Sequence, residues 1–287
     1  MEGFKITERT INVEKVFRDK NPGLASWIPG FVFSYLRKVI HEKEINDFLF
    51  TNREKNGLEF VDAIIDGFGA IVKVKGTENI PVQGRCILAA NHPLGGLDGV
   101  ALMQVIGRVR KDIVFPVNDI LTYLPNLQVL FIPVNKHGSN SENMRVFNET
   151  FESEKLVLYF PAGLVSRKQK GIIRDLDWKK TFISKAVQYR RDVLPVFIKG
   201  RNSGFFYNLA SLRKKLGIKA NIEMLFLPDE MYKQKGKTIE IVIGKPIRYQ
   251  VFDKRFTDAV WADHVKKFVY SLEQNPKGKF PFEIVEQ

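Results

Sequence analysis

One histidine in this 287-residue chain stands where it could act as a general base. Five residues separate His92 from Asp98, and the glycine pair Gly95-Gly96 lies between them. A neutral imidazole accepts a proton from a hydroxyl or amine near neutral pH, and a carboxylate on its second nitrogen fixes the tautomer and stabilises the cation. Such a pair suits acyl transfer. The alternatives are a buried structural histidine and an aspartate that only caps the following helix.

The residues before His92 predict a strand. Residues 86–90 form a short apolar run, so His92 follows the carboxyl end of a buried strand, where open α/β sheets hold their sites. The only cysteine, Cys86, has no disulfide partner within the chain. Its apolar neighbours indicate an inert core thiol, with a reactive thiol as the alternative.

Strand-like and helix-like patterns alternate along most of the chain. Short apolar runs predict strands at 71–74, 86–90, 113–117, 129–134, 156–160, 193–198, 222–227 and 239–243. Apolar residues at three- and four-residue spacings predict helices at 99–109, 141–152, 178–190, 205–216 and 252–272. We therefore expect an α/β fold with a mixed, mainly parallel central sheet flanked by helices.

The first seventy residues show helical patterns and no clear strand, so we expect an N-terminal helical segment at 1–70 and an α/β domain at 71–287. The stretch 22–40 is rich in aromatic residues and ends with basic ones: Trp27, Phe31, Phe33, Tyr35, Arg37 and Lys38. Such a stretch suits an interfacial helix on anionic lipid. A helical hairpin that caps the sheet is the other interpretation, because acidic residues follow at once.

The chain is basic, with 45 lysines and arginines against 32 acidic residues and a net charge of +13. This balance favours an anionic partner, either an acidic carrier protein, an anionic membrane surface or a nucleic acid. The chain carries no zinc-ligand spacing, basic heptad region or aromatic RNA-binding signature, which argues against nucleic acid. The polar start and the lack of a long apolar run predict a cytoplasmic protein that can still lie on a membrane.

Asn91-His92 followed by Asp98 resembles the first block of the glycerophospholipid acyltransferase (PlsC-like) superfamily, in which four residues separate the histidine from the aspartate. This chain has one residue more. The insertion with Gly95-Gly96 resembles the branch that contains hemolysin-like proteins and the bacterial N-acyltransferases that make ornithine and glycine lipids. Glycine permits backbone angles that absorb the extra residue.

Later segments resemble the second and third blocks of the superfamily in the expected order. Residues 131–136 resemble the second block, with Lys136 where an arginine commonly binds a glycerol phosphate. A lysine keeps the charge but loses the bidentate geometry. Residues 160–166 resemble the third block, with Ala162 and Val165 in place of its glutamate and arginine.

Residues 193–196 resemble the fourth block, and residues 200–207 resemble the segment that follows it in the hemolysin-like branch. The resemblance implies catalysis by His92 and Asp98, without a metal or a cofactor other than the acyl thioester. It also implies substrate binding by residues of the four blocks: Asn91, Gly95, Gly96, Lys136, Pro161, Gly163, Ser166, Arg167, Arg201 and Asn202. Amides near the glycines are candidates for an oxyanion hole.

The resemblance implies a peripheral enzyme on the inner face of the cytoplasmic membrane that moves a fatty acyl group from acyl carrier protein or coenzyme A to an amino-acid or lysolipid acceptor. The substitutions at Lys136, Ala162 and Val165 remove groups that hold a glycerol phosphate, so we favour an amino-acid acceptor. Arg167 and Lys168 would suit its carboxylate, with a solvated basic loop as the alternative. The competing functions are a lysophosphatidate O-acyltransferase and a non-catalytic lipid- or carrier-binding protein.

Overall fold

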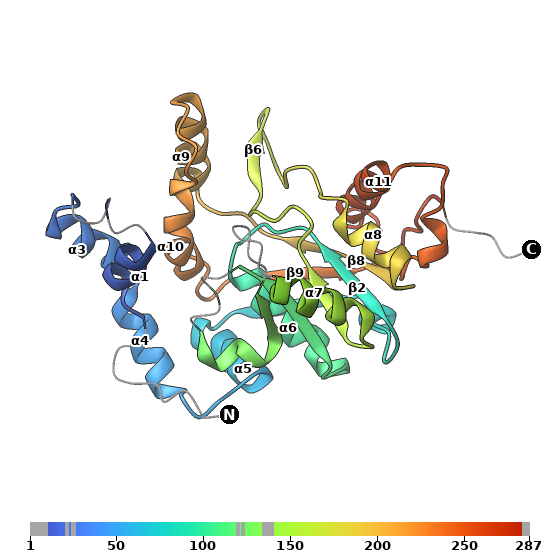
Figure 1. Ribbon diagram of the computed structural model, residues 1–287, viewed down its shortest axis with the longest axis horizontal. Helices are drawn as coiled ribbons and strands as arrows, with labels where there is room; N and C mark the ends of the chain where they lie inside the picture. Colours follow the sequence, from blue (N-terminus) through green and yellow to red (C-terminus); the bar gives the residue numbers. More distant parts are fainter. Residues whose placement is uncertain are drawn as a thin grey trace, which may run out of the picture.

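The computed structural model describes residues 11–20, 23, 27–118, 121, 124–133 and 141–282. Within these residues the central layer is a seven-stranded sheet in the order β1-β9-β8-β2-β5-β3-β4 (Figure 1). Its strands are β1 (Ile71–Lys75), β2 (Cys86–Ala90), β3 (Ile113–Val117), β4 (Phe131–Pro133), β5 (Leu156–Tyr159), β8 (Asp192–Lys199) and β9 (Thr238–Ile243). Neighbours are parallel except for β8 and β9. The expected mainly parallel α/β fold is confirmed.

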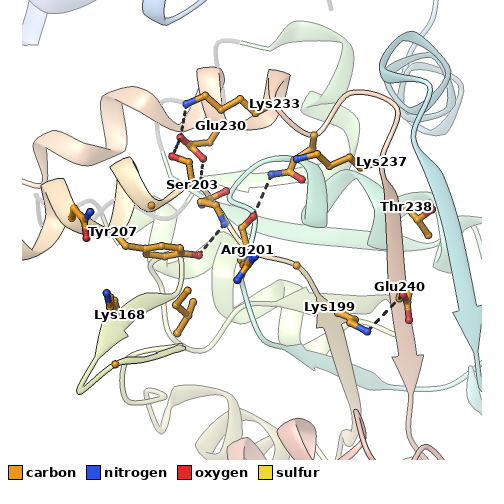
Figure 2. Close-up of a pocket in the computed structure, with 17 residues that line it drawn as sticks. Lys168, Lys199, Arg201, Ser203, Tyr207, Glu230, Lys233, Lys237, Thr238 and Glu240 are labelled. Carbon is orange, nitrogen blue, oxygen red and sulfur yellow. Dashed lines mark hydrogen bonds and ion pairs between the residues drawn. The ribbon is translucent and has the colours of Figure 1, made fainter.

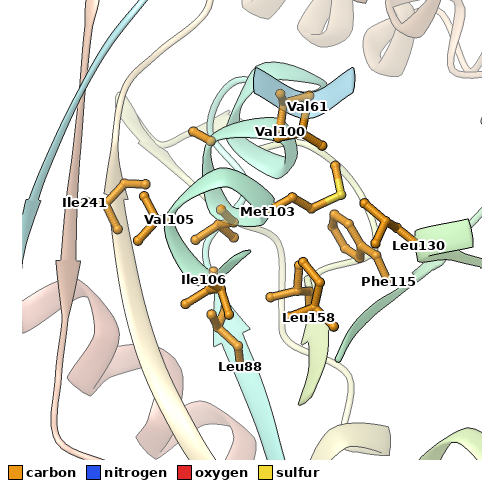
Figure 3. Packing of buried hydrophobic residues seen from close by; sticks show 14 of the residues in the cluster. Val61, Leu88, Val100, Met103, Val105, Ile106, Phe115, Leu130, Leu158 and Ile241 are labelled. Atoms are coloured by element: carbon orange, nitrogen blue, oxygen red, sulfur yellow. The ribbon is translucent and has the colours of Figure 1, made fainter. Parts of the chain in front are cut away.

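Helices cover both faces of the sheet, and the alternation of strand side chains divides the core between them. Leu88 and Leu158 face α5 (Leu58–Phe68) and α6 (Leu97–Val109), where Met103 and Ile106 pack against the strands (Figure 3). The neighbouring residues of the same strands face the other side of the sheet. That side is covered by α7 (Ser141–Glu152), α8 (Thr181–Gln188) and α11 (Asp258–Ser271).

Most of the described residues before position 70 lie in helices. They form α1 (Val13–Lys20), α3 (Gly30–Val39), α4 (Glu42–Thr51) and α5. The first three lie together at one end of the molecule beside α10 (Leu227–Tyr232), where His41 stacks on Tyr232 with ring centroids 3.9 Å apart (Figure 1). No helix in the described part of the chain has both the length and the apolar character to cross a bilayer.

The prediction of a strand at 222–227 is wrong. This stretch forms a 3-10 helix, η4 (Ile222–Phe226), that leads into α10. A short apolar run does not distinguish a strand from a buried helical turn. The physical reason lies in Glu223, which is fully buried and forms an ion pair of 2.8 Å with Arg167. The strand predicted at 129–134 is in part a 3-10 helix, η3 (Pro125–Leu130), followed by the short β4.

Most other predicted elements lie within a few residues of their expected bounds. The helix predicted at 205–216 is α9 (Gly204–Lys215), and the one predicted at 178–190 is the shorter α8. Short 3-10 turns, η1 (Thr77–Asn79) and η5 (Tyr249–Val251), connect elements near the sheet. Cys86 is buried in β2, where burial raises the pKa of its thiol to about 12. The thiol is therefore a core group, as predicted.

Candidate active site

His92 lies in the loop that joins β2 to α6, at the carboxyl edge of the parallel strands. Its neighbour Asn91 ties this loop to the adjacent strand β8: Nδ2 donates to the Ile198 carbonyl at 2.8 Å, and Oδ1 accepts from the Ile198 amide at 2.7 Å. Asn91 is buried and uses its whole amide in this way. The sequence predicted a substrate-binding role for Asn91; the structure places it in the support of the loop.

The predicted pair forms a direct hydrogen bond. His92 Nδ1 lies 2.9 Å from Asp98 Oδ2, which also accepts from the backbone amides of Leu94 at 2.8 Å and Gly95 at 3.2 Å. Because a carboxylate accepts at Nδ1, the neutral imidazole carries its proton there and its lone pair on Nε2. No described residue bonds to Nε2. The residue that caps α6 is Gly96, so Asp98 lies inside the first turn rather than at the cap.

Asp98 stays ionised although it is fully buried. Burial alone would raise the pKa of its carboxyl group. The charge and hydrogen bond of His92, together with the amides of Leu94 and Gly99, outweigh burial and lower the pKa below its ordinary value of 3.8. A carboxylate fixed at this point holds the orientation of the imidazole and would stabilise a positive charge on it.

Aromatic packing fixes the plane of the imidazole. Phe160, at the end of β5, stacks on His92 with ring centroids 4.0 Å apart and an interplanar angle of 16°. Phe115 meets Phe160 edge-on at 5.3 Å. Gly99 allows this packing, since a Cβ there would lie 3.0 Å from the Phe115 ring. The His92 side chain keeps 15% of its surface exposed, which leaves it open to a substrate.

A second buried carboxylate, Asp175, holds the backbone of His92. Asp175 Oδ1 accepts from the His92 amide at 3.2 Å and from Ser166 Oγ at 2.6 Å, while Oδ2 accepts from the Trp178 indole at 2.9 Å. Ser166 closes the loop, because its amide donates to the His92 carbonyl at 2.8 Å. The hydroxyl of Tyr270 accepts from the Asp175 amide at 2.8 Å. Burial raises the pKa of Asp175.

Asp175 and the hairpin before it were not predicted from the sequence. The strands of this hairpin, β6 (Arg167–Gln169) and β7 (Ile172–Arg174), have three residues each and are too short to show a periodic pattern. The available signal was the two-residue turn Lys170-Gly171, whose φ angles are +47° and +85°. Two successive positive φ angles are typical of a tight hairpin turn.

The glycines singled out by sequence permit close approaches of the backbone. Gly95 has φ +93°, and a Cβ there would lie 2.9 Å from Leu227. A Cβ on Gly96 would lie 3.0 Å from Met231 Sδ, so α10 packs directly against the glycine pair. Gly163, with φ +65°, forms an exposed turn whose amide donates to the Phe160 carbonyl at 3.0 Å. α10 is thus the element that packs against the loop between His92 and Asp98.

Residues in and after the third block mostly form contacts within the protein, and few of their side chains are free to bind a substrate. The Pro161 carbonyl accepts from the Lys179 amide at 3.0 Å. Arg167 is buried, pairs with Glu223 at 2.8 Å and lies over the Phe206 ring at 5.0 Å. Burial lowers the pKa of Arg167. Its charge is therefore already neutralised within the protein, whereas the adjacent Lys168 is exposed.

The remaining predicted residues lie elsewhere. Lys136 falls outside the described residues. Arg201 and Asn202 line a cavity of about 1000 Å³ between β6, α9 and the start of β9, and His92 is not among its lining residues (Figure 2). Within the described ranges no cluster of His, Cys, Asp and Glu is arranged to hold a metal ion.

Comparison with known proteins adds three findings. The family described as "Acyltransferase" matches residues 15–276. Lyso-glycine lipid O-acyltransferases from Bacteroides thetaiotaomicron and Phocaeicola vulgatus are 49% and 47% identical over 264 residues, covering 91% of this chain and 97% and 95% of theirs. The crystal structure of the 1-acyl-sn-glycerophosphate (LPA) acyltransferase PlsC from Thermotoga maritima aligns with 85% of this chain and 93% of that one, at 17% identity and a TM-score of 0.45.

Proposed function

This chain belongs to the acyltransferase family, and from that premise we propose that it acylates the hydroxyl of a lyso-glycine lipid with an acyl group from a thioester. The resemblance to glycerophospholipid acyltransferases predicted from the sequence is confirmed at the level of the family. The sequence favoured an amino-acid acceptor, with a lysolipid as the alternative. The names of the two relatives, both of which align over nearly their full length, support the lysolipid and a hydroxyl nucleophile.

The observation that carries the mechanism is the hydrogen bond of 2.9 Å between His92 Nδ1 and the buried carboxylate of Asp98. In the proposed reaction the acceptor hydroxyl attacks the thioester carbonyl while His92 Nε2 takes its proton. Asp98 stabilises the imidazolium that forms. The tetrahedral intermediate then collapses to an ester and a thiolate, which recovers the proton from His92. Atoms and charge balance without an acyl-enzyme.

Lysophosphatidate is the weaker candidate for the acceptor. The position where the third block commonly has an arginine holds Val165, which is fully buried, and Ala162 is buried as well. The nearby Arg167 is already paired with Glu223. A phosphate monoester is bound best by bidentate or multiple cationic contacts, and this loop offers neither.

We also propose that the first helices contact the membrane surface. Trp27, Phe31 and Tyr35 follow one another at four-residue spacing and are 86%, 75% and 55% exposed. Phe33, on the opposite side of α3, is only 1% exposed and packs against Phe17 of α1. The exposed rings of Phe31 and Tyr35 on α3, with Trp27 in the turn before it, suit insertion at the headgroup boundary because Phe33 anchors the helix from its other side. The double substitution Trp27→Ser and Phe31→Ser should reduce sedimentation with anionic vesicles, and unchanged sedimentation would exclude this contact.

An acceptor assay tests the proposed reaction. The purified protein is incubated with an acyl thioester and, in separate reactions, with a lyso-glycine lipid, free glycine and lysophosphatidate, and the products are identified by mass spectrometry. We expect an ester product from the lyso-glycine lipid. A product from lysophosphatidate or glycine alone would overturn the proposed acceptor.

A further inference from the structure

A basic cavity lies beside the His92 loop. It has a volume of about 1000 Å³ and is bordered by the β6–β7 hairpin, the segment between β8 and α9, α10 and the start of β9 (Figure 2). Gly200 connects it to the catalytic loop, because a Cβ there would lie 2.7 Å from Leu94. The backbone that forms the cavity therefore rests directly on the segment that carries His92.

The charges that line the cavity are unbalanced. Five lining side chains are cationic and two are acidic: Lys168, Lys199, Arg201, Lys233, Lys237, Glu230 and Glu240. Both acids already have partners. Glu230 is buried and accepts from the Ser203 hydroxyl at 2.6 Å and from Lys233 at 2.8 Å, and Glu240 lies 3.8 Å from Lys199.

Three of the five cationic side chains are not paired with an acidic side chain in the described part of the chain. Lys168, Arg201 and Lys237 have no acidic partner among the residues that the structure describes, and all three are exposed at the cavity. They come from three separate parts of the chain, namely the hairpin, the segment after β8 and the turn before β9. Their convergence indicates a site for a ligand with more than one negative charge.

Asn202 adds an independent observation. This lining residue is only 4% exposed, yet neither its side-chain oxygen nor its side-chain nitrogen has a hydrogen-bond partner in the described structure. Its backbone amide, in contrast, donates to the Tyr207 hydroxyl at 2.9 Å. A buried amide without partners destabilises a fold, so it points to a ligand that offers both a donor and an acceptor.

We propose that this cavity binds the phosphate-bearing pantetheine arm of the thioester donor, with Arg201 and its neighbouring lysines on phosphate and Asn202 on an amide of the arm. The inference rests on the proposed function for the use of a thioester. Coenzyme A and the prosthetic arm of an acyl carrier protein share this chemistry. The phosphate and the thioester lie at opposite ends of the arm. The phosphate can therefore lie in the cavity while the thioester lies at His92, which does not line the cavity.

The glycine headgroup of the acceptor fits the cavity less well. It offers a single carboxylate, which one cation would satisfy, whereas three cations here lack partners. The diphosphate of coenzyme A carries two negative charges and, with a nearby amide of the arm, uses the lysines, the guanidinium and the buried amide together. The observations therefore favour the donor over the acceptor.

The substitution Arg201→Ala tests the proposal, since an exposed side chain without partners can be removed without loss of the fold. Calorimetric titration with coenzyme A should show affinity at least about tenfold weaker, the effect expected for a lost charge-assisted contact. The KM for acyl-coenzyme A should rise in parallel, and the KM for the acceptor should stay constant. Lys111→Ala is the matched control, because it removes an exposed lysine before β3, at the opposite edge of the sheet.

The same variants assayed with an acyl carrier thioester distinguish the two sources of the arm. A higher KM for both donors supports the pantetheine phosphate as the bound group, and a higher KM for acyl-coenzyme A alone supports the nucleotide phosphates. Unchanged affinity for coenzyme A in Arg201→Ala, or an effect on the acceptor KM only, overturns the proposal. Titration measures the binding of coenzyme A without any reaction. It therefore tests the cavity even if the wild-type protein fails to acylate a lyso-glycine lipid, which would contradict only the proposed function.

Discussion

The His92 loop and the basic cavity lie against each other at one edge of the sheet, but they differ in whether their buried polar side chains have hydrogen-bond partners. Asp98 accepts hydrogen bonds from His92 and from the amides of Leu94, Gly95 and Gly99. In the cavity, Asn202 is buried without a side-chain partner. Satisfied groups fix a geometry before the substrate arrives, whereas unsatisfied ones receive their partner with a ligand. The two regions should therefore respond differently to substitution.

The largest effect is expected at the base. His92→Ala should reduce kcat by about a thousandfold or more, because proton transfer and the orientation of the nucleophile are lost together. Circular dichroism should show an unchanged fold, since Asp98 keeps the amides of Leu94, Gly95 and Gly99 when the imidazole is removed. His264→Ala is the control, because His264 packs among Phe256, Trp261 and Phe282 and should leave kcat unchanged. Full activity in His92→Ala would refute the mechanism.

A somewhat smaller effect on rate, joined to a loss of stability, is expected at the acid. Asp98→Asn should reduce kcat by about a hundredfold or more and the free energy of unfolding by about 1 to 3 kcal/mol, since a neutral amide replaces a charge that four donors surround. Steady-state kinetics and urea denaturation measure the two effects. A stability loss with normal kcat would mean that Asp98 only supports the fold.

The same variant should change the acid dependence of stability. The folded-state pKa of Asp98 lies below the ordinary value of 3.8, so its contribution is present above pH 3.8 and is lost as the pH falls through the folded-state pKa. The difference in free energy of unfolding between wild type and Asp98→Asn should therefore shrink in acid. A difference that stays constant between neutral pH and pH 3 would contradict the lowered pKa.

An intermediate effect is expected behind the catalytic loop. In Asp175→Asn the new NH₂ group must face either the Trp178 indole or the donors of Ser166 and His92, so at least one of these hydrogen bonds is lost. We expect kcat to fall about tenfold, near the value of one lost hydrogen bond to a charged group. Both KM values should stay constant. A change in KM without a change in kcat would place Asp175 in substrate binding.

The smallest effect is expected in the cavity, where a substitution should raise the free energy of unfolding rather than lower it. Asn202→Leu replaces a buried amide without partners by an apolar side chain of similar size and should raise the free energy of unfolding by about 1 kcal/mol. The affinity for coenzyme A should fall at the same time. If Asn202→Leu instead lowered the free energy of unfolding as much as Asp98→Asn does, the side chain of Asn202 would support the fold rather than a ligand.

The sequence predicted the part of the site whose residues lie close together in the chain. His92 and Asp98 lie in one strand–loop–helix unit, so residue types and spacing suffice to bring them together. Asp175 lies 83 positions from His92 and follows a hairpin whose strands are too short to show a periodic pattern. Pairwise spacing contains no information on such a contact.

The fold shows the same division between local pattern and long-range contact. The central strands β2, β3 and β5 are apolar runs buried on both faces, and these were largely predicted. The stretch 222–227 has a comparable pattern but is helical, because Glu223 pairs there with Arg167 and Arg213. Likewise, the cavity joins residues of the hairpin, α10 and β9, which no single window of sequence contains.

The antiparallel pairing of β9 with β8 has a consequence for engineering. Because β9 runs against its neighbour, the catalytic edge receives the first residues of β9 and the turn that precedes it, in which Gly236 has φ +71°. The backbone of this turn is anchored by the bond of 2.8 Å from the Gly236 amide to Phe68. Substitution of Lys237, the one residue between this anchor and Thr238, would change the wall of the cavity while leaving the parallel strands and the His92 loop untouched. Under the proposed donor site, this turn is the place to alter donor preference separately from the His92 loop.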